Sequence, residues 1–156
     1  ATPALDMMLE IIRADHGMAL ALSVAGIFIY EQDQPSTDPQ HIVSAGRLAL
    51  AAPQLVRAIR LMEESIAEPL PIGQIARHAG YSLRNLQLYF QNHLNSTPQA
   101  YYLELRLNAG RRQLQQTRHS VAEIAEACGF NSASAFARAY RKRFGEAPLE
   151  TRRSYK

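Results

Sequence analysis

Side chains capable of directional hydrogen bonding recur at helical spacing in two stretches of this 156-residue chain. The first set occupies positions i, i+3, i+4 and i+7 and consists of Arg84, Gln87, Leu88 and Gln91. A helix over this stretch places all four side chains on one face. Arginine and glutamine can each form paired hydrogen bonds with the edge of a base, and leucine can contact the methyl group of thymine. We therefore interpret this face as a recognition surface.

The second stretch lies 50 residues later and is richer in basic side chains. Its outward positions, which we predict to contact bases, are Ser134, Ala135 and Arg138. The basic residues that follow near the end of the same helix are Arg141, Lys142 and Arg143. Basic side chains placed there suit phosphate groups better than base edges. The phosphate contacts that we predict for the whole chain are Gln91, Ser120, Ser132, Arg141 and Lys142.

Residue types typical of catalysis and metal binding occur without the spacing that such sites need. Cys128 is the only cysteine, which excludes an internal disulfide and a multi-cysteine metal site. It matches Ala79 in the repeat described next, so we expect a buried small side chain rather than a nucleophile. The five histidines are scattered, and no pair within one predicted element has metal-ligand spacing. We predict no catalytic residue, no metal and no cofactor.

The two stretches belong to an internal repeat. At an offset of 49, the spacing of Ile72, Ile75, Ala76 and Ala79 recurs in Val121, Ile124, Ala125 and Cys128, and Gly80-Tyr81 recurs as Gly129-Phe130. At an offset of 50, Leu86 matches Phe136, Phe90 matches Tyr140, Asn95 matches Gly145, and Pro98 matches Pro148. A repeat of this kind indicates a duplicated supersecondary unit.

Each repeat unit is predicted to be a short helix, a glycine-aromatic turn and a second helix, over residues 72–95 and 120–145. The turn glycines permit a positive φ that ends the first helix sharply. The predicted N-caps are Ser82 for the first unit, Asn131 or Ser132 for the second, and Ser120 with Glu123 as a capping box. The predicted core side chains of the second helices are Leu83, Leu86, Phe90 and Leu94, and Phe136, Tyr140 and Phe144. This is helix-turn-helix geometry, in which the second helix enters the major groove of DNA.

A linker helix is predicted over residues 97–116, capped by Thr97. About 18 helical residues span roughly 27 Å, close to the ~34 Å of one turn of DNA. The linker could therefore place the two second helices in successive segments of the major groove. Its expected core residues are Leu103, Leu107 and Leu114. Arg106 could contact phosphate, but in the middle of the linker we expect it to pair with an acidic side chain such as Glu63 or Glu64.

Charge is distributed unevenly along the chain, although its net value is only +3. Residues 1–71 hold 4 basic and 9 acidic residues, and residues 72–156 hold 13 and 5. A basic half beside an acidic half indicates a polyanion-binding module attached to something else.

No apolar run approaches the roughly 18–20 residues of a membrane span. We therefore expect a cytoplasmic protein that does not bind membranes.

The first part of the chain has a different character. Residues 4–30 predict two helices, the first amphipathic and ending near Gly17, the second almost uniformly apolar. Residues 31–52 have linker composition with a weakly helical end, and a further helix is predicted from Pro53 to Pro69. We thus divide the chain into N-terminal helices (1–30), a linker (31–52) and a DNA-binding domain (53–156).

The sequence over residues 55–156 resembles the DNA-binding domain of AraC/XylS-type bacterial transcription regulators. The resemblance lies in "IARHAGYSLRNLQLYFQNHLNSTPQAYYLELRLNAGRRQL" and "VAEIAEACGFNSASAFARAYRKRFGEAPLETRR". It implies an all-helical fold of seven helices with two helix-turn-helix units, sequence-specific binding of double-stranded DNA, and gene activation together with RNA polymerase. The positions that depart from the family pattern are Leu88, Asn95, Ala133 and Ala135.

The segment "ALDMMLEIIRADHGMALALSVA" is similar to the last helices of a glutamine-amidotransferase-like (DJ-1/PfpI-type) sensor domain. That resemblance implies a truncated sensor domain, whose absent body would bind a small-molecule effector. Two other functions remain open from the sequence alone. The basic surface could serve an acidic protein partner in a helical interaction module, or the helix-turn-helix units could be the DNA-binding appendage of an enzyme.

Overall fold

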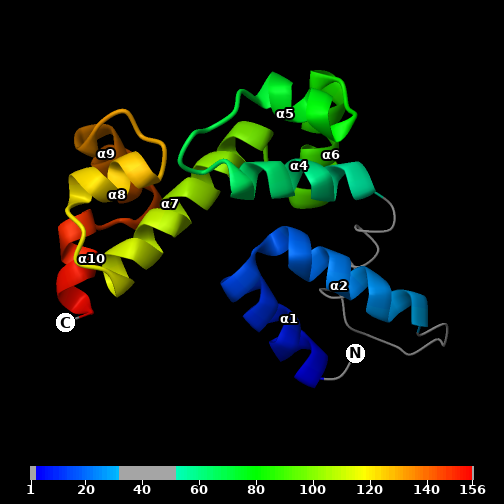
Figure 1. Cartoon of the computed structure of the whole chain (residues 1–156), viewed down its shortest axis with the longest axis horizontal. Helices are drawn as coiled ribbons and strands as arrows, with labels where there is room; N and C mark the ends of the chain where they lie inside the picture. Colours follow the sequence, from blue (N-terminus) through cyan, green and yellow to red (C-terminus); the bar gives the residue numbers. More distant parts are fainter. Residues whose placement is uncertain (1–2, 32–51, 156) are drawn as a thin grey trace. The chain divides into compact units, whose positions relative to one another are not determined.

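The computed structural model describes residues 3–31 and 52–155, and within these ranges the chain consists of helices and short connections without strands (Figure 1). The all-helical prediction is therefore confirmed. The described helices form two compact units, one with α1, α2, α4, α5 and α6, the other with α7 to α10. The predicted linker and its weakly helical end lie almost wholly in residues 32–51, outside the described residues. None of the described helices is both long and apolar enough to cross a bilayer.

Two antiparallel helices begin the first unit. α1 (Pro3–His16) and α2 (Met18–Glu31) are joined at Gly17, whose φ of 90° lies in the left-handed region. Leu9 and Ala25 are buried between the two helices, and further apolar side chains pack against them. The two predicted N-terminal helices and the stop at glycine are confirmed.

The first helix-turn-helix follows α4 (Pro53–Glu64) and consists of α5 (Ile72–Ala79) and α6 (Leu83–Leu94). Gly80 ends α5 with a φ of 83°, and the Ser82 hydroxyl caps α6 by accepting a hydrogen bond of 3.1 Å from the Asn85 N–H. The buried side chains of these three helices and their connections include Leu55, Ile59, Met62, Ile75, Ala79, Tyr81, Leu86 and Phe90. This core fixes which face of α6 is outward.

The helix that starts at Pro53 ends at Glu64, although the sequence predicted that it continues to Pro69. The hydroxyl of Tyr102 binds the backbone of the segment that follows Glu64. It donates a hydrogen bond of 2.8 Å to the Ser65 carbonyl and accepts one of 3.3 Å from the Leu70 N–H. In a helix that continued to Pro69 the Ser65 carbonyl would have no partner, because proline lacks an N–H. The tyrosine from α7 satisfies this carbonyl and the first N–H after the proline instead.

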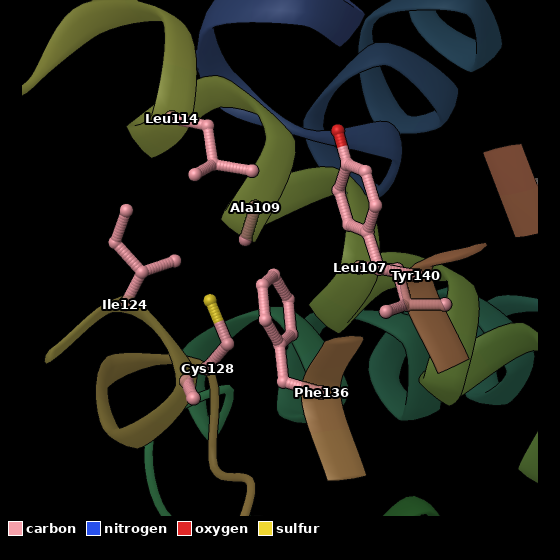
Figure 2. Packing of buried hydrophobic residues seen from close by; sticks show 8 residues of the cluster. Leu107, Ala109, Leu114, Ile124, Cys128, Phe136 and Tyr140 are labelled. Atoms are coloured by element: carbon pink, nitrogen blue, oxygen red, sulfur yellow. The ribbon is translucent and has the colours of Figure 1, made fainter. Parts of the chain in front are cut away.

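The second unit is built on α7 (Pro98–Gln116), α8 (Val121–Ala127), α9 (Ala133–Phe144) and α10 (Pro148–Ser154). One hydrophobic cluster fills it and contains Leu107, Ala109, Leu114, Ile124, Ala125, Cys128, Phe136 and Tyr140. Figure 2 shows the Phe136 ring in the centre of this cluster, close to the Cys128 thiol and below Ala109 of α7. The core of the second helix-turn-helix is thus completed by the linker helix.

Two leucines predicted to be core residues are exposed instead. Leu83 is 45% exposed in the first turn of α6, and the turn residue Tyr81 is buried. Leu103 is 39% exposed because it lies on α7 before the stretch, beginning at Leu107, that contributes to the hydrophobic cluster. Both leucines share a helix face with a true core residue, which is why periodicity alone selected them.

Gly110 lies in the interior of α7, where glycine normally destabilises a helix. The aromatic ring of Phe136 explains its presence. A methyl group added at Gly110 would lie 2.7 Å from two ring carbons of Phe136, closer than real contacts allow. The glycine therefore permits α9 to approach α7 closely.

Replacing Gly110 with alanine should lower the free energy of unfolding by roughly 1–3 kcal/mol, because overpacking outweighs the gain in helix propensity. Gly73→Ala is the matched control: it adds a methyl group to α5, where nothing lies within 4 Å. We expect this control to raise stability by at most about 1 kcal/mol. Urea unfolding followed by circular dichroism measures both, and equal stabilities of the two variants would contradict the packing argument.

Candidate nucleic-acid interface

The outward face of α6 carries the predicted recognition residues. Leu86 and Phe90 are fully buried, and α6 turns by about 100° per residue, so the opposite face points to solvent. Arg84, Gln87, Leu88 and Gln91 all lie on that face and are exposed. Within the described residues, no hydrogen bond or ion pair holds the side chains of Arg84 and Gln87. These two groups keep their full hydrogen-bonding capacity for a ligand.

The outward face of α9 is arranged in the same way but carries fewer long hydrogen-bonding side chains. Phe136 and Tyr140 are fully buried and correspond to the two core residues of α6. Ser134 and Arg138 are exposed on the opposite side, and Ala135 is half-buried. Arg138 is therefore the one long polar side chain among the three predicted base-contacting positions of this helix.

Three of the predicted phosphate contacts also serve as local structure. The Ser132 hydroxyl caps α9, accepting a hydrogen bond of 3.1 Å from Ala135 N–H, and lies 3.2 Å from the hydroxyl of Ser134. The Ser120 hydroxyl caps α8 by accepting from Glu123 N–H at 3.2 Å. Gln91 donates to the Asn95 side chain at 3.1 Å. The sequence left Asn131 and Ser132 as alternative caps, and the structure selects Ser132.

The basic end of α9 separates into free and engaged side chains. Arg141 and Lys142 are exposed, and among the described residues no ion pair involves them. Arg143 instead forms an ion pair with Glu104 of α7, and its guanidinium lies 5.2 Å from the centre of the Phe144 ring. Arg143 therefore links α9 to α7. Arg141 and Lys142 remain as the cations at the end of α9 that are available to phosphate.

Arg106 does not pair with Glu63 or Glu64, so that expectation was wrong. Its guanidinium donates hydrogen bonds to the carbonyls of Cys128, at 2.8 Å, and Gly129, at 2.6 Å. These carbonyls end α8 and lack helical partners, and a cation is favoured there by the helix dipole.

The Arg106 guanidinium also stacks on the aromatic residue of the same turn. It lies 4.3 Å from the centre of the Phe130 ring, a cation–π contact. Burial lowers the pKa of Arg106, with Tyr102 opposing that effect, but an arginine stays protonated throughout the physiological range. Arg106 thus holds the turn of the second helix-turn-helix to the linker helix.

The same turn contains Cys128, whose side chain is fully buried in the hydrophobic cluster. Burial raises the pKa of the thiol, outweighing the positive charges of Arg106 and Arg112 that act in the opposite direction. A raised pKa disfavours the nucleophilic thiolate at neutral pH. Among the described residues, no group of three or more histidine, cysteine, aspartate or glutamate side chains is placed to hold a metal ion.

A buried polar network beside α9 was not anticipated from the sequence. The Tyr140 hydroxyl lies 2.8 Å from the hydroxyl of Thr151, which is fully buried and donates to the Glu146 carboxylate. This chain of hydrogen bonds attaches α10 to the back of the second recognition helix. Periodicity predicted the burial of Tyr140, but no local pattern identifies a hydrogen-bond partner eleven residues away.

A duplicated helix-turn-helix, with each second helix packed by its apolar face and carrying exposed arginine on the other, defines a DNA-binding protein. Comparison with known proteins supports this class. A family profile described as "Helix-turn-helix domain" matches residues 75–154. The chain belongs to the helix-turn-helix domain family of AraC-type transcription regulators.

Individual relatives agree with this assignment. The chain is 41% identical over 148 residues to the "HTH-type transcriptional regulator ArgR" of Pseudomonas aeruginosa, an alignment that covers 95% of this chain and 45% of that protein. A crystal structure of an AraC-type DNA-binding domain protein from Chromobacterium violaceum has a TM-score of 0.66 and 44% identity, covering 69% of this chain and 96% of the other. The DNA-binding domain of AdpA, solved in complex with a target DNA, has a TM-score of 0.62 and 26% identity, covering 65% and 92%.

Replacing Arg106 with lysine should lower the free energy of unfolding by roughly 1–3 kcal/mol, because lysine cannot make both carbonyl bonds and stack on the ring. Arg112→Lys, an exposed position on the same helix, is the matched control and should change stability by less than about 0.5 kcal/mol. Chemical denaturation of the three proteins provides the test. If both lysine variants behave alike, the carbonyl contacts of Arg106 contribute nothing to stability.

Proposed function

We propose that this chain is the DNA-reading module of a transcription regulator, with α6 and α9 entering successive segments of one major groove. The observation that carries the proposal is the repeated burial of the apolar face on each second helix, which leaves an arginine-bearing face exposed. The DNA complex of the AdpA domain, which shares this fold, supports it. In this proposal the base contacts are made by Arg84, Gln87, Leu88, Ser134, Ala135 and Arg138. The phosphate contacts are made by Gln91, Ser120, Ser132, Arg141 and Lys142.

The two helices have different chemistry in this proposal. On α6, Arg84 suits guanine, because its two donors match two acceptors on the base edge, and Gln87 suits adenine, because its donor and acceptor match an acceptor and a donor there. On α9, two of the three base-facing side chains are the short Ser134 and Ala135, so Arg138 is the main group able to reach a base. The basic end of α9 supplies attraction to phosphate that does not depend on sequence.

The activity of a whole regulator is a wider proposal, because this chain spans less than half the length of the ArgR relative. We propose that α1 and α2 belong to a sensor domain of DJ-1/PfpI type that binds a small-molecule effector. We further propose that the regulator works in the bacterial cytoplasm as an activator that contacts RNA polymerase. The likeness of residues 4–25 to that sensor domain supports the first part, and the family supports the second.

Replacing Arg84 or Arg138 with alanine should cost roughly 1–3 kcal/mol of binding free energy and relax the sequence preference at the bases each side chain reads. Arg60→Ala removes the same charge from an exposed position on α4 and is the matched control. Fluorescence anisotropy with selected and random duplexes measures both properties. Binding should also weaken steeply as salt is raised, because counterions are released from the phosphates. Undiminished selectivity in both Arg84→Ala and Arg138→Ala would refute base reading by these residues.

The buried thiol separates this proposal from an enzyme that uses Cys128. The pKa of the Cys128 thiol is raised by burial, so the folded state retains the proton at a pH where the unfolded chain loses it. We expect slow thiol labelling of the folded chain at neutral pH and fast labelling in denaturant. The same shift makes folding stability decline as the pH rises above about 8.5, the ordinary thiol pKa. Fast labelling of the native protein, with its far-ultraviolet spectrum unchanged, would favour a reactive cysteine.

A further inference from the structure

Leu88 is an apolar side chain on an otherwise polar face of α6. It is 49% exposed, and the exposed polar residues on the same side of α6 include Arg84, Gln87, Gln91 and Asn92. A single exposed leucine on a protein surface needs no special explanation. This one, however, lies in the middle of a set of hydrogen-bonding groups, one helical turn after Arg84 and just before Gln91. Any ligand that engages those groups must also cover Leu88.

The position of Leu88 on the helix separates it from the core. It lies about 160° around the α6 axis from Phe90, the fully buried anchor of the helix, at 100° per residue. It lies only about 40° from Arg84 and 60° from Gln91. Leu83, the other exposed leucine of α6, is about 140° from Leu88 and adjacent to the core side. Leu88 therefore belongs to the recognition surface, and Leu83 does not.

We propose that Leu88 reads a pyrimidine 5-methyl group in the major groove, which makes the site of α6 dependent on a methylated pyrimidine. This inference rests on the proposed function and specifies the ligand of that same surface. The 5-methyl group is the apolar feature that a base pair presents in the major groove, and thymine carries it in unmodified DNA. Leucine offers no hydrogen bond to the amino group of cytosine, so discrimination at this base comes from burying the methyl group. A 5-methylcytosine presents the same methyl group and is therefore a second source of the same contact.

The test uses duplexes that the 156-residue chain selects from a random pool. The half-site of α6 is the set of positions where Arg84→Ala, Gln87→Ala or Leu88→Ala loses its base preference. Each thymine there is replaced in turn by uracil, which removes the methyl group and leaves base pairing unchanged. We expect one replacement to weaken binding of the native chain about four-fold, the loss of one buried methyl group. The same replacement should leave binding of Leu88→Ala unchanged.

A second pair of duplexes distinguishes the two sources of the methyl group. At the position found above, cytosine and 5-methylcytosine are compared opposite guanine. The native chain should bind the 5-methylcytosine duplex several-fold more tightly than the cytosine duplex, and Leu88→Ala should not distinguish them. If the native chain distinguishes thymine from uracil but not 5-methylcytosine from cytosine, Leu88 contacts the methyl group of thymine only, and the inference holds for unmodified DNA.

Leu83→Ala is the matched control, because it removes an exposed leucine from the same helix outside the recognition face. It should keep the full sensitivity to uracil. The inference is overturned if no uracil replacement affects the native chain, or if each weakens the native chain and Leu88→Ala equally. Selective binding of DNA would persist in that case, so the proposed function would stand. A chain that binds selected and random duplexes equally would instead refute the proposed function, and the inference with it.

Discussion

The organisation of the recognition surfaces depends on the burial of two side chains, four residues apart, on each second helix. Leu86 and Phe90 anchor α6, and Phe136 and Tyr140 anchor α9, all with no exposed surface. Because a helix turns about 100° per residue, one buried pair determines the rotation of the whole helix about its axis. The polar residues then face outward without any further contact to direct them. Burial of the apolar side therefore places the groups able to read DNA.

The turn glycines of the two repeats have the same backbone conformation but differ in the space around them. Gly80 and Gly129 both have a positive φ, at 83° and 74°. Residues other than glycine and asparagine rarely adopt this backbone conformation. A methyl group on Gly80 would approach only the Gln54 side chain, at 4.0 Å. On Gly129 it would overlap the ring of Pro69 and lie 2.6 Å from the Ile66 carbonyl oxygen. The first turn requires glycine for its conformation, whereas the second also requires it for space.

Much of this architecture could be predicted because the information is local. The turn glycines, the caps Ser82, Thr97 and Ser120, and the anchors of both second helices follow from spacing and residue type within a few positions. The errors arose where a distant residue decided the outcome. The helix that starts at Pro53 ends at Glu64, and the hydroxyl of Tyr102, 32 to 37 residues away in sequence, binds the backbone of the segment that follows. Arg106 was assigned an acidic partner because pairing rules favour opposite charges, but its partners are carbonyls that become available only when α8 ends.

In the second unit, several tertiary contacts hold the recognition helix, but the outward face of that helix carries few side chains that could read bases. Its turn is held by Arg106, its recognition helix approaches Gly110 closely, and α10 is attached behind it through Thr151. The outward face of α9 offers two short side chains, Ser134 and Ala135, together with Arg138. The cations Arg141 and Lys142 follow at the end of the helix. Contacts to phosphate do not distinguish sequences, but they fix the register and orientation of a protein on the duplex. The proposed function thus assigns positioning chiefly to α9 and discrimination among bases chiefly to α6, whose outward side chains differ most in chemistry.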